Sequence, residues 1–372
     1  MTLPPQRRGG GPRVLLVPDL AVERWPSMDR YASALAQRLP VAVPEAHRTV
    51  DGLRYLARYV RYPRALRREP RPALVHLADH SYAHCLAAFP GVPSVVTVHD
   101  LHPVHLLQLG GSLRALPRNT MLRRTLRWLP RADRLVAVSR FVADEVVRLI
   151  GLPEERIAVA PNGVDDAFFG APHPAVVTER RQGWLSASGV SGRARVLLHV
   201  GSCVARKRID LAIATLAELR RQGMEAVFVQ IGGVFTAEHR AVIAQHGVTS
   251  LVVQEPRVTE AALVTAYYAA DALLMPSSYE GFGLPVLEAL AAGLPVVTSG
   301  AGGMKEAGGD AAVVVSPDDP ARWAEALAAL VLEQGGARAS RRQRGIAHAR
   351  RHSWDATAHR VRAVYAELGV EI

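Results

Sequence analysis

Short apolar runs alternate with amphipathic stretches along the whole chain. The runs are rich in Val, Leu and Ile and are bounded by Gly, Pro, Asp or Ser. Such runs are typical of strands buried on both faces of a parallel sheet, and the stretches between them have the period of helices. The alternation predicts a doubly wound α/β fold. The predicted strands are residues 13–17, 73–77, 94–98, 134–138, 157–160, 195–200, 226–231, 251–254, 272–275, 295–298 and 312–315.

The helical stretches and one irregular region indicate how the chain is divided. Residues 29–37 and 140–149 have helical patterns, and residues 337–368 form an arginine-rich helical tail interrupted near Ser353. Residues 170–192 mix Pro, Gly, Ser and charge without a sustained period, which is typical of a connection between domains. A chain of 372 residues that is 49% hydrophobic is long enough for two cores. We therefore expect two globular domains.

The composition narrows the class of protein. The only cysteines, Cys85 and Cys203, are far apart in sequence, which indicates a reduced, cytoplasmic protein without a disulfide. No apolar run is long enough to predict a transmembrane helix. The net charge is +11, and all but two of the 45 basic residues are arginine. Against that background, Lys207 stands out as a position that uses a compact ammonium group.

Residues 276–298 have the composition of a ligand site. Pro285 fits the first turn of a helix, and Gly293 can end that helix in the left-handed conformation before a short strand. Gly281 and Gly283 lie just before the helix, where free N–H groups and the helix dipole favour an anion such as a phosphate. The segment therefore predicts a loop, helix and strand that bind an anionic ligand.

Carboxylates and a second, basic loop add to this site. Glu280 precedes the predicted helix and Glu288 lies inside it, and carboxylates beside an anion site are best explained by ligand hydroxyl groups. A strand that ends before Gly201 leads into Arg206 and Lys207, at the edge of the sheet where ligands of open α/β folds bind. An ordinary solvated basic turn is the alternative. Together, the two loops predict a ligand with both a diphosphate and sugar hydroxyls.

The run Glu-Gly-Phe-Gly-Leu-Pro-Val-Leu-Glu at residues 280–288 resembles the signature of the retaining nucleotide-sugar glycosyltransferases of family 4, which have the GT-B fold. The resemblance spans nearly the whole chain. Its other motifs are Arg206-Lys207 after a strand and glycine, His99-Asp100, Val138-Ser139, Ala160-Pro161-Asn162-Gly163-Val164-Asp165 and Ser353-Trp354.

This resemblance implies a domain organisation. Two facing Rossmann-like domains are expected, with residues 1–172 binding the acceptor and residues 193–350 binding the nucleotide-sugar donor. Residues 173–192 would link them, and a C-terminal helix in residues 351–372 would pack back on the first domain.

The resemblance also implies roles for individual residues. Glu288 would bind the donor ribose, Glu280 the hydroxyls of the transferred sugar, and Arg206 and Lys207 the diphosphate. His99 would lie at the reacting sugar, which makes His99 and Glu280 the candidate catalytic residues. The other residues expected at the donor are Gly201, Gly281, Phe282, Gly283 and Leu284, with Arg257 and Val258 as our interpretation of the base pocket.

The implied activity is transfer of a hexose, of the mannosyl or glucosyl type, from a GDP- or UDP-sugar. The acceptor would be a hydroxyl of a glycan, a lipid-linked sugar or a polysaccharide, and a small natural product is the alternative. The chain has no Asp-Xaa-Asp motif, which agrees with a family that binds the phosphates without metal, and no cofactor is expected. We expect retention by front-face attack, in which a donor phosphate oxygen takes the acceptor proton. Two features depart from the family pattern: Ser202 replaces a frequent arginine, and residues 18–28 contain Trp25 where paired glycines are common.

Several other interpretations remain open. His99, His102 and His105 could bind a metal ion, although few carboxylates accompany them in sequence. Glu280 and Glu288 could be the acid and nucleophile of a glycoside hydrolase, but a hydrolase would not need the basic loop.

The positive charge allows two kinds of partner. Residues 54–71 and 114–134 are basic and amphipathic, so they are either ordinary surface helices or a peripheral contact with the inner face of the cell membrane. Nucleic-acid binding would also suit a pI near 10.3, but no nucleic-acid motif accompanies it. We therefore expect no nucleic-acid partner.

Overall fold

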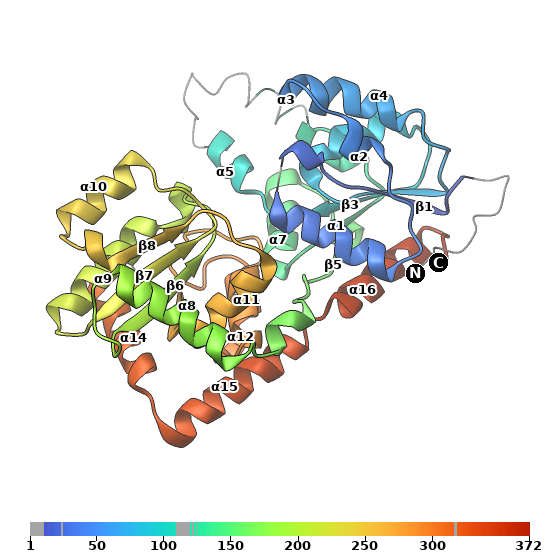
Figure 1. The fold of residues 1–372 in the computed structure, drawn as a ribbon. Coiled ribbons are helices and arrows are strands. Elements are labelled where there is room, and N and C mark those ends of the chain that lie inside the picture. Colours follow the sequence, from blue (N-terminus) through green and yellow to red (C-terminus); the bar gives the residue numbers. More distant parts are fainter. Residues whose placement is uncertain (1–10, 24, 109–119, 121–122, 124, 316–317) are drawn as a thin grey trace. The chain divides into compact units, whose positions relative to one another are not determined.

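The computed structural model describes residues 11–372 except Arg24, residues 109–119, 121–122, 124 and 316–317. The chain forms two compact units, Met1–Gly163 with Trp354–Ile372, and Val164–Ser353 (Figure 1). No helix among the described residues is both long enough and apolar enough to cross a bilayer.

The first unit contains a five-stranded, all-parallel sheet of order β1-β2-β3-β4-β5. All five strands lie where the apolar runs predict them, and all residues of β2 and β3 are buried. The strands are β1 (Val14–Val17), β2 (Leu74–Leu77), β3 (Ser94–Val98), β4 (Arg134–Ala137) and β5 (Ile157–Val159).

The C-terminal helix α16 (Trp354–Glu367) packs within the first unit against α1 (Pro26–Arg38). It is held to the sheet by a buried polar network. His76 on β2 is hydrogen-bonded to the Tyr365 hydroxyl at 2.6 Å and to Thr97 on β3 at 2.8 Å. Trp354 and Tyr365 are among the largest fully buried side chains. Other helical segments of this unit are η1 (Ala21–Glu23), α2 (Ala46–Thr49), α3 (Arg54–Leu56), η2 (Ala57–Arg61), α4 (Tyr62–Leu66), η3 (His80–Ala88), α5 (His102–Gln108), η5 (Leu129–Arg131), α7 (Arg140–Glu145), η6 (Val146–Ile150) and η7 (Glu154–Arg156).

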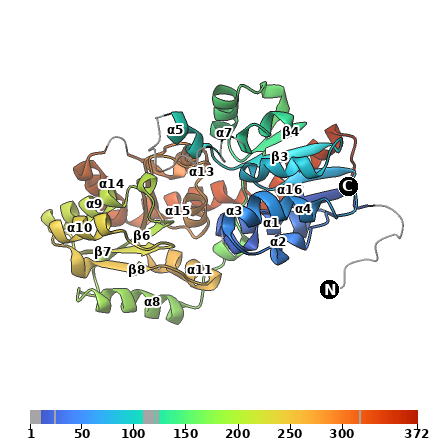
Figure 2. The ribbon, with the colours of Figure 1, turned by 90° about the horizontal axis from the view of Figure 1, so that it is seen from above.

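The second unit contains a six-stranded parallel sheet of order β11-β10-β9-β6-β7-β8. Figure 2 shows α9 (Ile209–Arg221) and α14 (Pro320–Leu332) on one side of this sheet, and α8 (Pro174–Ala187) beside α11 (Glu260–Ala269) on the other. The strands again match the predicted runs, and the two sheets confirm the α/β class. They are β6 (Arg195–Val200), β7 (Ala226–Ile231), β8 (Val252–Glu255), β9 (Ala272–Met275), β10 (Val296–Thr298) and β11 (Val313–Val314).

The other helical segments of the second unit follow the same alternation with the strands. They are η8 (Asp166–Phe169), η9 (Ala205–Lys207), α10 (Ala237–Gln245), η10 (Thr249–Leu251), α12 (Leu284–Ala291), α13 (Met304–Gly308), η11 (Gly309–Ala311) and α15 (Gly335–Arg350). The break between α15 and α16 falls at residues 351–353, as the helical tail predicts.

Helix α8 corrects one prediction. Residues 173–192 are expected to be a linker, yet most of them form this helix inside the second unit. Its apolar residues do not form one stripe, and of its side chains only Trp184 and Leu185 are buried. The helix is fixed instead by partners distant in sequence, because Arg181 pairs with Asp271 at 2.8 Å and the Trp184 indole donates to Glu255 at 2.7 Å.

Candidate functional site

The glycine loop and helix α12 have the predicted geometry. Gly283 precedes the helix with a φ of +104°, a conformation that favours glycine. A Cβ atom on Gly283 would also lie 2.8 Å from Cγ of Met304, so the position needs glycine for two reasons. Pro285 lies in the first turn, and Gly293 follows the helix with a φ of +72°. The predicted loop, helix and strand are therefore confirmed.

The basic loop begins where β6 ends. Gly201 has a φ of +150°, and a Cβ atom there would lie 3.3 Å from Nζ of Lys207. Arg208 has a φ of +51°, and its guanidinium group is held by Asp210 and by Asp318. Arg208 is thus paired with carboxylates other than Glu280. Arg206 and Lys207 are the two basic residues of this loop that contact Glu280 in the glycine loop.

Glu280 forms ion pairs with both of these basic residues. Nζ of Lys207 lies 2.5 Å from one carboxylate oxygen, and the Arg206 guanidinium lies 2.9 Å from the other. Glu280 is only 7% exposed, and Lys207 is equally buried. Burial alone would raise the pKa of Glu280, but the charges of Lys207 and Arg206 outweigh it and hold that pKa below its usual range. The predicted sugar-binding carboxylate and the predicted phosphate-binding cations thus form one charged cluster.

Glu288 has a different partner. It lies on α12, is buried, and accepts a 2.6 Å hydrogen bond from the hydroxyl of Tyr267 on α11. Arg257 and Val258 follow β8 and precede α11, whose first turn is capped by Thr259. Arg257 is exposed and Val258 partly buried.

Two features of this site are not among the sequence predictions. Gly303 packs on the glycine loop so closely that a Cβ atom would lie 2.3 Å from the carbonyl oxygen of Gly281, and its N–H donates to the carbonyl of Glu280 at 2.9 Å. The sequence does contain a sign of this close contact, because Gly302 and Gly303 lie in a glycine-rich loop that follows a strand.

His199 is the second feature. It is a completely buried residue of β6, and its ring lies next to Gly201, with 3.6 Å between Cε1 and the position of a Cβ atom there. Neither ring nitrogen has a hydrogen-bond partner among the described residues. Burial, and then the charge of Lys207, lower the pKa of His199 to about 3. A neutral imidazole therefore lies next to the charged cluster. The sequence does not indicate this, because His199 lies within an apolar run.

His99 lies at the end of β3 in the first unit. It is buried, its Nε2 donates to the carbonyl of Ala78 at 2.8 Å, and the ring of Tyr31 meets it edge-on. Burial lowers the pKa of His99, which favours the neutral ring. Of the other histidines in the suggested metal cluster, His105 pairs with Glu145 at 2.6 Å. The described part of the chain contains no group of three His, Cys, Asp or Glu residues arranged to hold a metal ion.

Comparison with known proteins relates both units to one family. Residues 181–352 match the model described as Glycosyl transferases group 1, and residues 18–168 match the model described as Glycosyltransferase Family 4. A D-inositol 3-phosphate glycosyltransferase of Thermobispora bispora is 34% identical over 289 residues, which are 74% of this chain and 65% of that protein. A protein of the same name from Actinosynnema mirum is 32% identical, and the match covers 74% of this chain and 67% of that protein. The chain thus spans less than two thirds of the first of these relatives.

A solved structure extends the comparison to the fold. The Anabaena protein HepE in complex with UDP and glucose superposes with a TM-score of 0.74 at 18% identity, over 95% of this chain and 99% of that one. The similarity confirms the predicted GT-B fold.

Proposed function

The chain belongs to glycosyltransferase family 4, and from this premise we propose that it transfers a hexose, of the mannosyl or glucosyl type, from a nucleotide-diphosphate sugar to a hydroxyl group. The observation that carries the proposal is the cluster of Arg206, Lys207 and Glu280 at the carboxyl end of β6 and beside α12. Such an edge of a parallel sheet, next to a helix N-terminus, is where nucleotides bind in related folds.

The cluster suits a donor that carries both charge and hydroxyl groups. A diphosphate would compete with Glu280 for Arg206 and Lys207, and each charge-assisted bond would contribute about 1.5–3 kcal/mol. The Glu280 carboxylate would then be available to accept hydrogen bonds from the sugar hydroxyls. The same two cations would stabilise the charge that develops on the leaving diphosphate, so no metal ion is needed for that step. Glu288 would accept a hydrogen bond from the donor ribose.

We propose that transfer retains the anomeric configuration. With the nucleotide diphosphate leaving from the face that the acceptor attacks, a phosphate oxygen can take the acceptor proton, and Glu280 positions the sugar. A product of inverted anomeric configuration would contradict this mechanism.

Nucleotide binding tests the donor half directly. UDP or GDP should raise the melting temperature of the full chain, because a ligand that binds only the folded state stabilises it by about 2.7 kcal/mol at a hundred times its Kd. The shift should be much smaller in Arg206→Gln. It should be unchanged in Arg221→Gln, a matched control whose guanidinium pairs with Glu218 on the surface of α9. If neither nucleotide changed the melting temperature, the proposal would be wrong.

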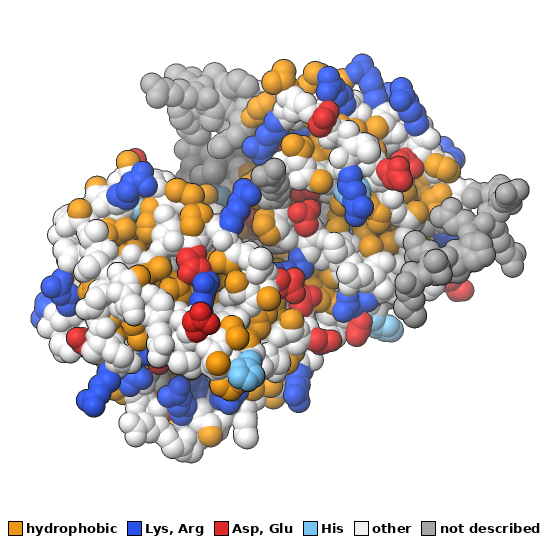
Figure 3. Space-filling view, in the orientation of Figure 1, with side chains coloured by type: hydrophobic (Ala, Val, Ile, Leu, Met, Phe, Trp, Pro, Cys, Tyr) orange, Lys and Arg blue, Asp and Glu red, His pale blue; other side chains and the backbone are white. Residues whose placement is uncertain are grey.

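The acceptor is proposed to be a glycan or a lipid-linked sugar reached at a membrane surface. Leu53, which directly precedes the helical stretch of α3, η2 and α4, and Tyr55 in α3 are exposed. Figure 3 shows basic side chains gathered over the same stretch. Apolar and basic side chains together favour anionic headgroups. Of the other basic segment, residues 114–119, 121–122 and 124 lie outside the described residues.

Vesicle binding tests this surface. The protein should sediment with vesicles that contain phosphatidylglycerol several-fold more than with vesicles of phosphatidylcholine alone. Leu53→Ser should reduce the bound fraction, whereas Val176→Ser, a change at an exposed apolar residue of α8, should not. Equal binding to both vesicle types would exclude the membrane contact and favour a small, soluble acceptor.

A further inference from the structure

Three polar side chains form a row across the sheet of the second unit. They are His199 on β6, Gln230 on β7 and Gln254 on β8, and the strand register pairs His199 with Gln230 and Gln230 with Gln254. Each is the last residue but one of its strand. The row therefore lies next to the loops that follow these strands, and one of them is the basic loop that carries Arg206 and Lys207.

The middle residue of this row, Gln230, is a buried amide in a strand that is otherwise apolar. Such an amide costs free energy unless its polar atoms are paired. Here Nε2 donates to the carbonyl oxygen of Gly201 at 2.7 Å, and Oε1 accepts from Nε2 of Gln254 at 3.3 Å. A carbonyl can only accept, so the contact with Gly201 determines which end of the Gln230 amide faces the loop. Gln254 stabilises this orientation from the other side.

Gly201 is the residue at which β6 becomes the basic loop. Its N–H donates to the carbonyl of Ile231 on β7 at 2.8 Å, and its carbonyl accepts from Gln230 on the same strand. Both backbone polar groups of Gly201 are therefore held by β7. The ammonium group of Lys207 packs directly against this glycine, since a Cβ atom there would lie 3.3 Å from Nζ. The backbone conformation at Gly201 thus helps to set the position of the Lys207 ammonium.

The loop after β7 packs on the same part of the basic loop. A Cβ atom on Gly232 would lie 3.3 Å from the carbonyl oxygen of Gly201, and one on Gly233 would lie 2.6 Å from the backbone nitrogen of Cys203. Backbone packing of this kind restricts how closely the two loops approach, but it has little directional preference. The hydrogen bond from Gln230 is directional, so it selects one orientation of the Gly201 carbonyl.

We propose that Gln230 is a positioning residue of the donor site, and that its hydrogen bond to Gly201 holds the basic loop in the conformation that presents Lys207 to the diphosphate. Gln230 need not contact the nucleotide. Without its amide, the carbonyl of Gly201 loses a buried partner and the loop populates other conformations. The apparent Kd then rises in proportion, because only a fraction of the molecules is competent to bind. The part of this role that concerns the diphosphate rests on the proposed function.

Gln230→Leu tests the role by two measurements, since leucine fills a similar volume without a hydrogen bond. The first needs no nucleotide: hydrogen exchange of peptides that cover residues 201–208 should be about tenfold faster in the variant. The second is titration calorimetry with UDP and with GDP, well below the melting temperature. The nucleotide that binds the unchanged protein should bind the variant about tenfold more weakly. A purely structural role would lower the melting temperature and leave the Kd of the folded protein unchanged.

The two measurements separate this inference from the proposed function. Unchanged exchange in the loop, or an unchanged Kd, would overturn the positioning role. If neither UDP nor GDP bound the unchanged protein, the donor function itself would be wrong, whatever the exchange rates were. Thr215→Val is the matched control, because it also removes a buried hydrogen bond of the same unit, from the Thr215 hydroxyl to the carbonyl of Leu211 within α9. This variant should change neither the loop exchange nor the Kd.

Gln254→Leu provides a second variant at the edge strand of the sheet, where the side chain is only partly buried. It should weaken nucleotide binding less than Gln230→Leu does. Nε2 of Gln254 also lies 4.0 Å from Sγ of Cys203 in the basic loop. If Gln254 acts by orienting Gln230, the double variant should bind as Gln230→Leu does, whereas additive effects would overturn this order of action. If Gln230→Leu did not fold, unchanged exchange and affinity in Gln254→Leu would overturn the proposal.

Discussion

Replacing Glu280 by Gln should lower the rate of sugar transfer by about 10²–10³-fold while leaving the affinity for UDP unchanged or higher. In the free protein Glu280 neutralises both Arg206 and Lys207, so it competes with the nucleotide for the two cations. A neutral amide of the same size removes this competition. It also removes the carboxylate that we propose binds the hydroxyls of the transferred sugar, and turnover therefore falls although the nucleotide binds.

The measurement is UDP affinity by calorimetry together with the rate of UDP release at saturating donor and acceptor. Glu288→Gln is the informative contrast, because a residue that binds the donor ribose should weaken donor binding and leave the saturated rate nearly unchanged. Glu218→Gln is the control, since this carboxylate forms only a surface pair with Arg221 and a bond with Gln222 in the same unit. If both active-site variants lost affinity and rate in equal measure, the separate roles of Glu280 and Glu288 would be wrong.

The donor loop could be predicted from sequence because its constraints are local. The positive φ angles at Gly283 and Gly293 and the position of Pro285 depend on a few neighbouring residues. The strands could be predicted from the sequence equally well, because a strand that is buried on both faces forms an apolar run. These local rules place the elements, and the resemblance to a known family assigns their roles.

The rest of the donor site depends on contacts between distant residues. The ion pairs of Glu280 join residues 73 and 74 positions apart, and no local pattern states that the carboxylate neutralises the cations. Gly303 is a glycine because of the backbone of Gly281, which comes from another loop. His199 lies among apolar residues of β6, and the sequence gives no sign that its ring is buried without a hydrogen-bond partner among the described residues.

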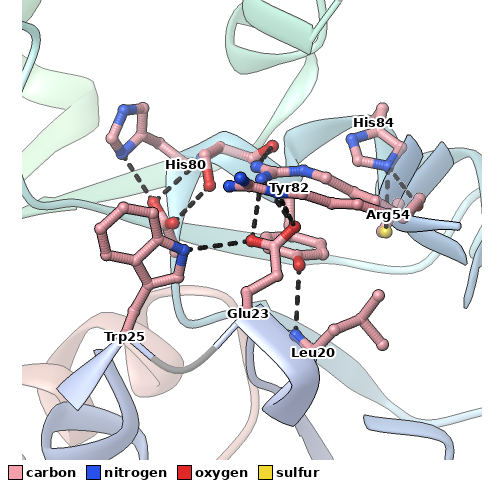
Figure 4. Close-up of polar contacts among 11 residues, drawn as sticks. Leu20, Glu23, Trp25, Arg54, His80, Tyr82 and His84 are labelled. Atoms are coloured by element: carbon pink, nitrogen blue, oxygen red, sulfur yellow. Dashed lines mark hydrogen bonds and ion pairs between the residues drawn. The ribbon is translucent and has the colours of Figure 1, made fainter. Parts of the chain in front are cut away.

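In the first unit, too, the sequence does not predict contacts between distant segments. Sequence places Asp19, Glu23 and Trp25 in a loop after the first strand and Asp79 after the second, but each segment alone is an ordinary turn. In the structure these two segments form one polar cluster (Figure 4), where Asp19 and Asp79 are neighbours. The cluster exists because parallel strands bring their carboxyl ends to one edge of a sheet. Topology therefore had to be known before this polar cluster could be described.

His199 should make the second unit sensitive to acid. Its pKa is about 3 in the folded protein, because the ring is buried beside Lys207, with only partial compensation from Glu280. The ordinary histidine pKa near 6.5 applies once the chain unfolds. Above pH 6.5 the ring is neutral in both states and adds no pH dependence. As pH falls from 6.5 toward 3, the unfolded chain takes up a proton that the folded chain does not, so the free energy of unfolding falls by about 1.4 kcal/mol per pH unit from this residue.

The test compares urea unfolding of the unchanged protein and His199→Leu between pH 7.5 and pH 4.5. At pH 7.5 the variant should be as stable or more stable, because the ring nitrogens have no hydrogen-bond partner among the described residues and nothing is left unpaired. Below pH 6 the variant should lose stability less steeply, by about 1.4 kcal/mol per pH unit. An unchanged slope would mean that the imidazole is protonated in the folded protein, with Glu280 as its counter-charge, and the donor cluster would then carry one more positive charge toward the diphosphate.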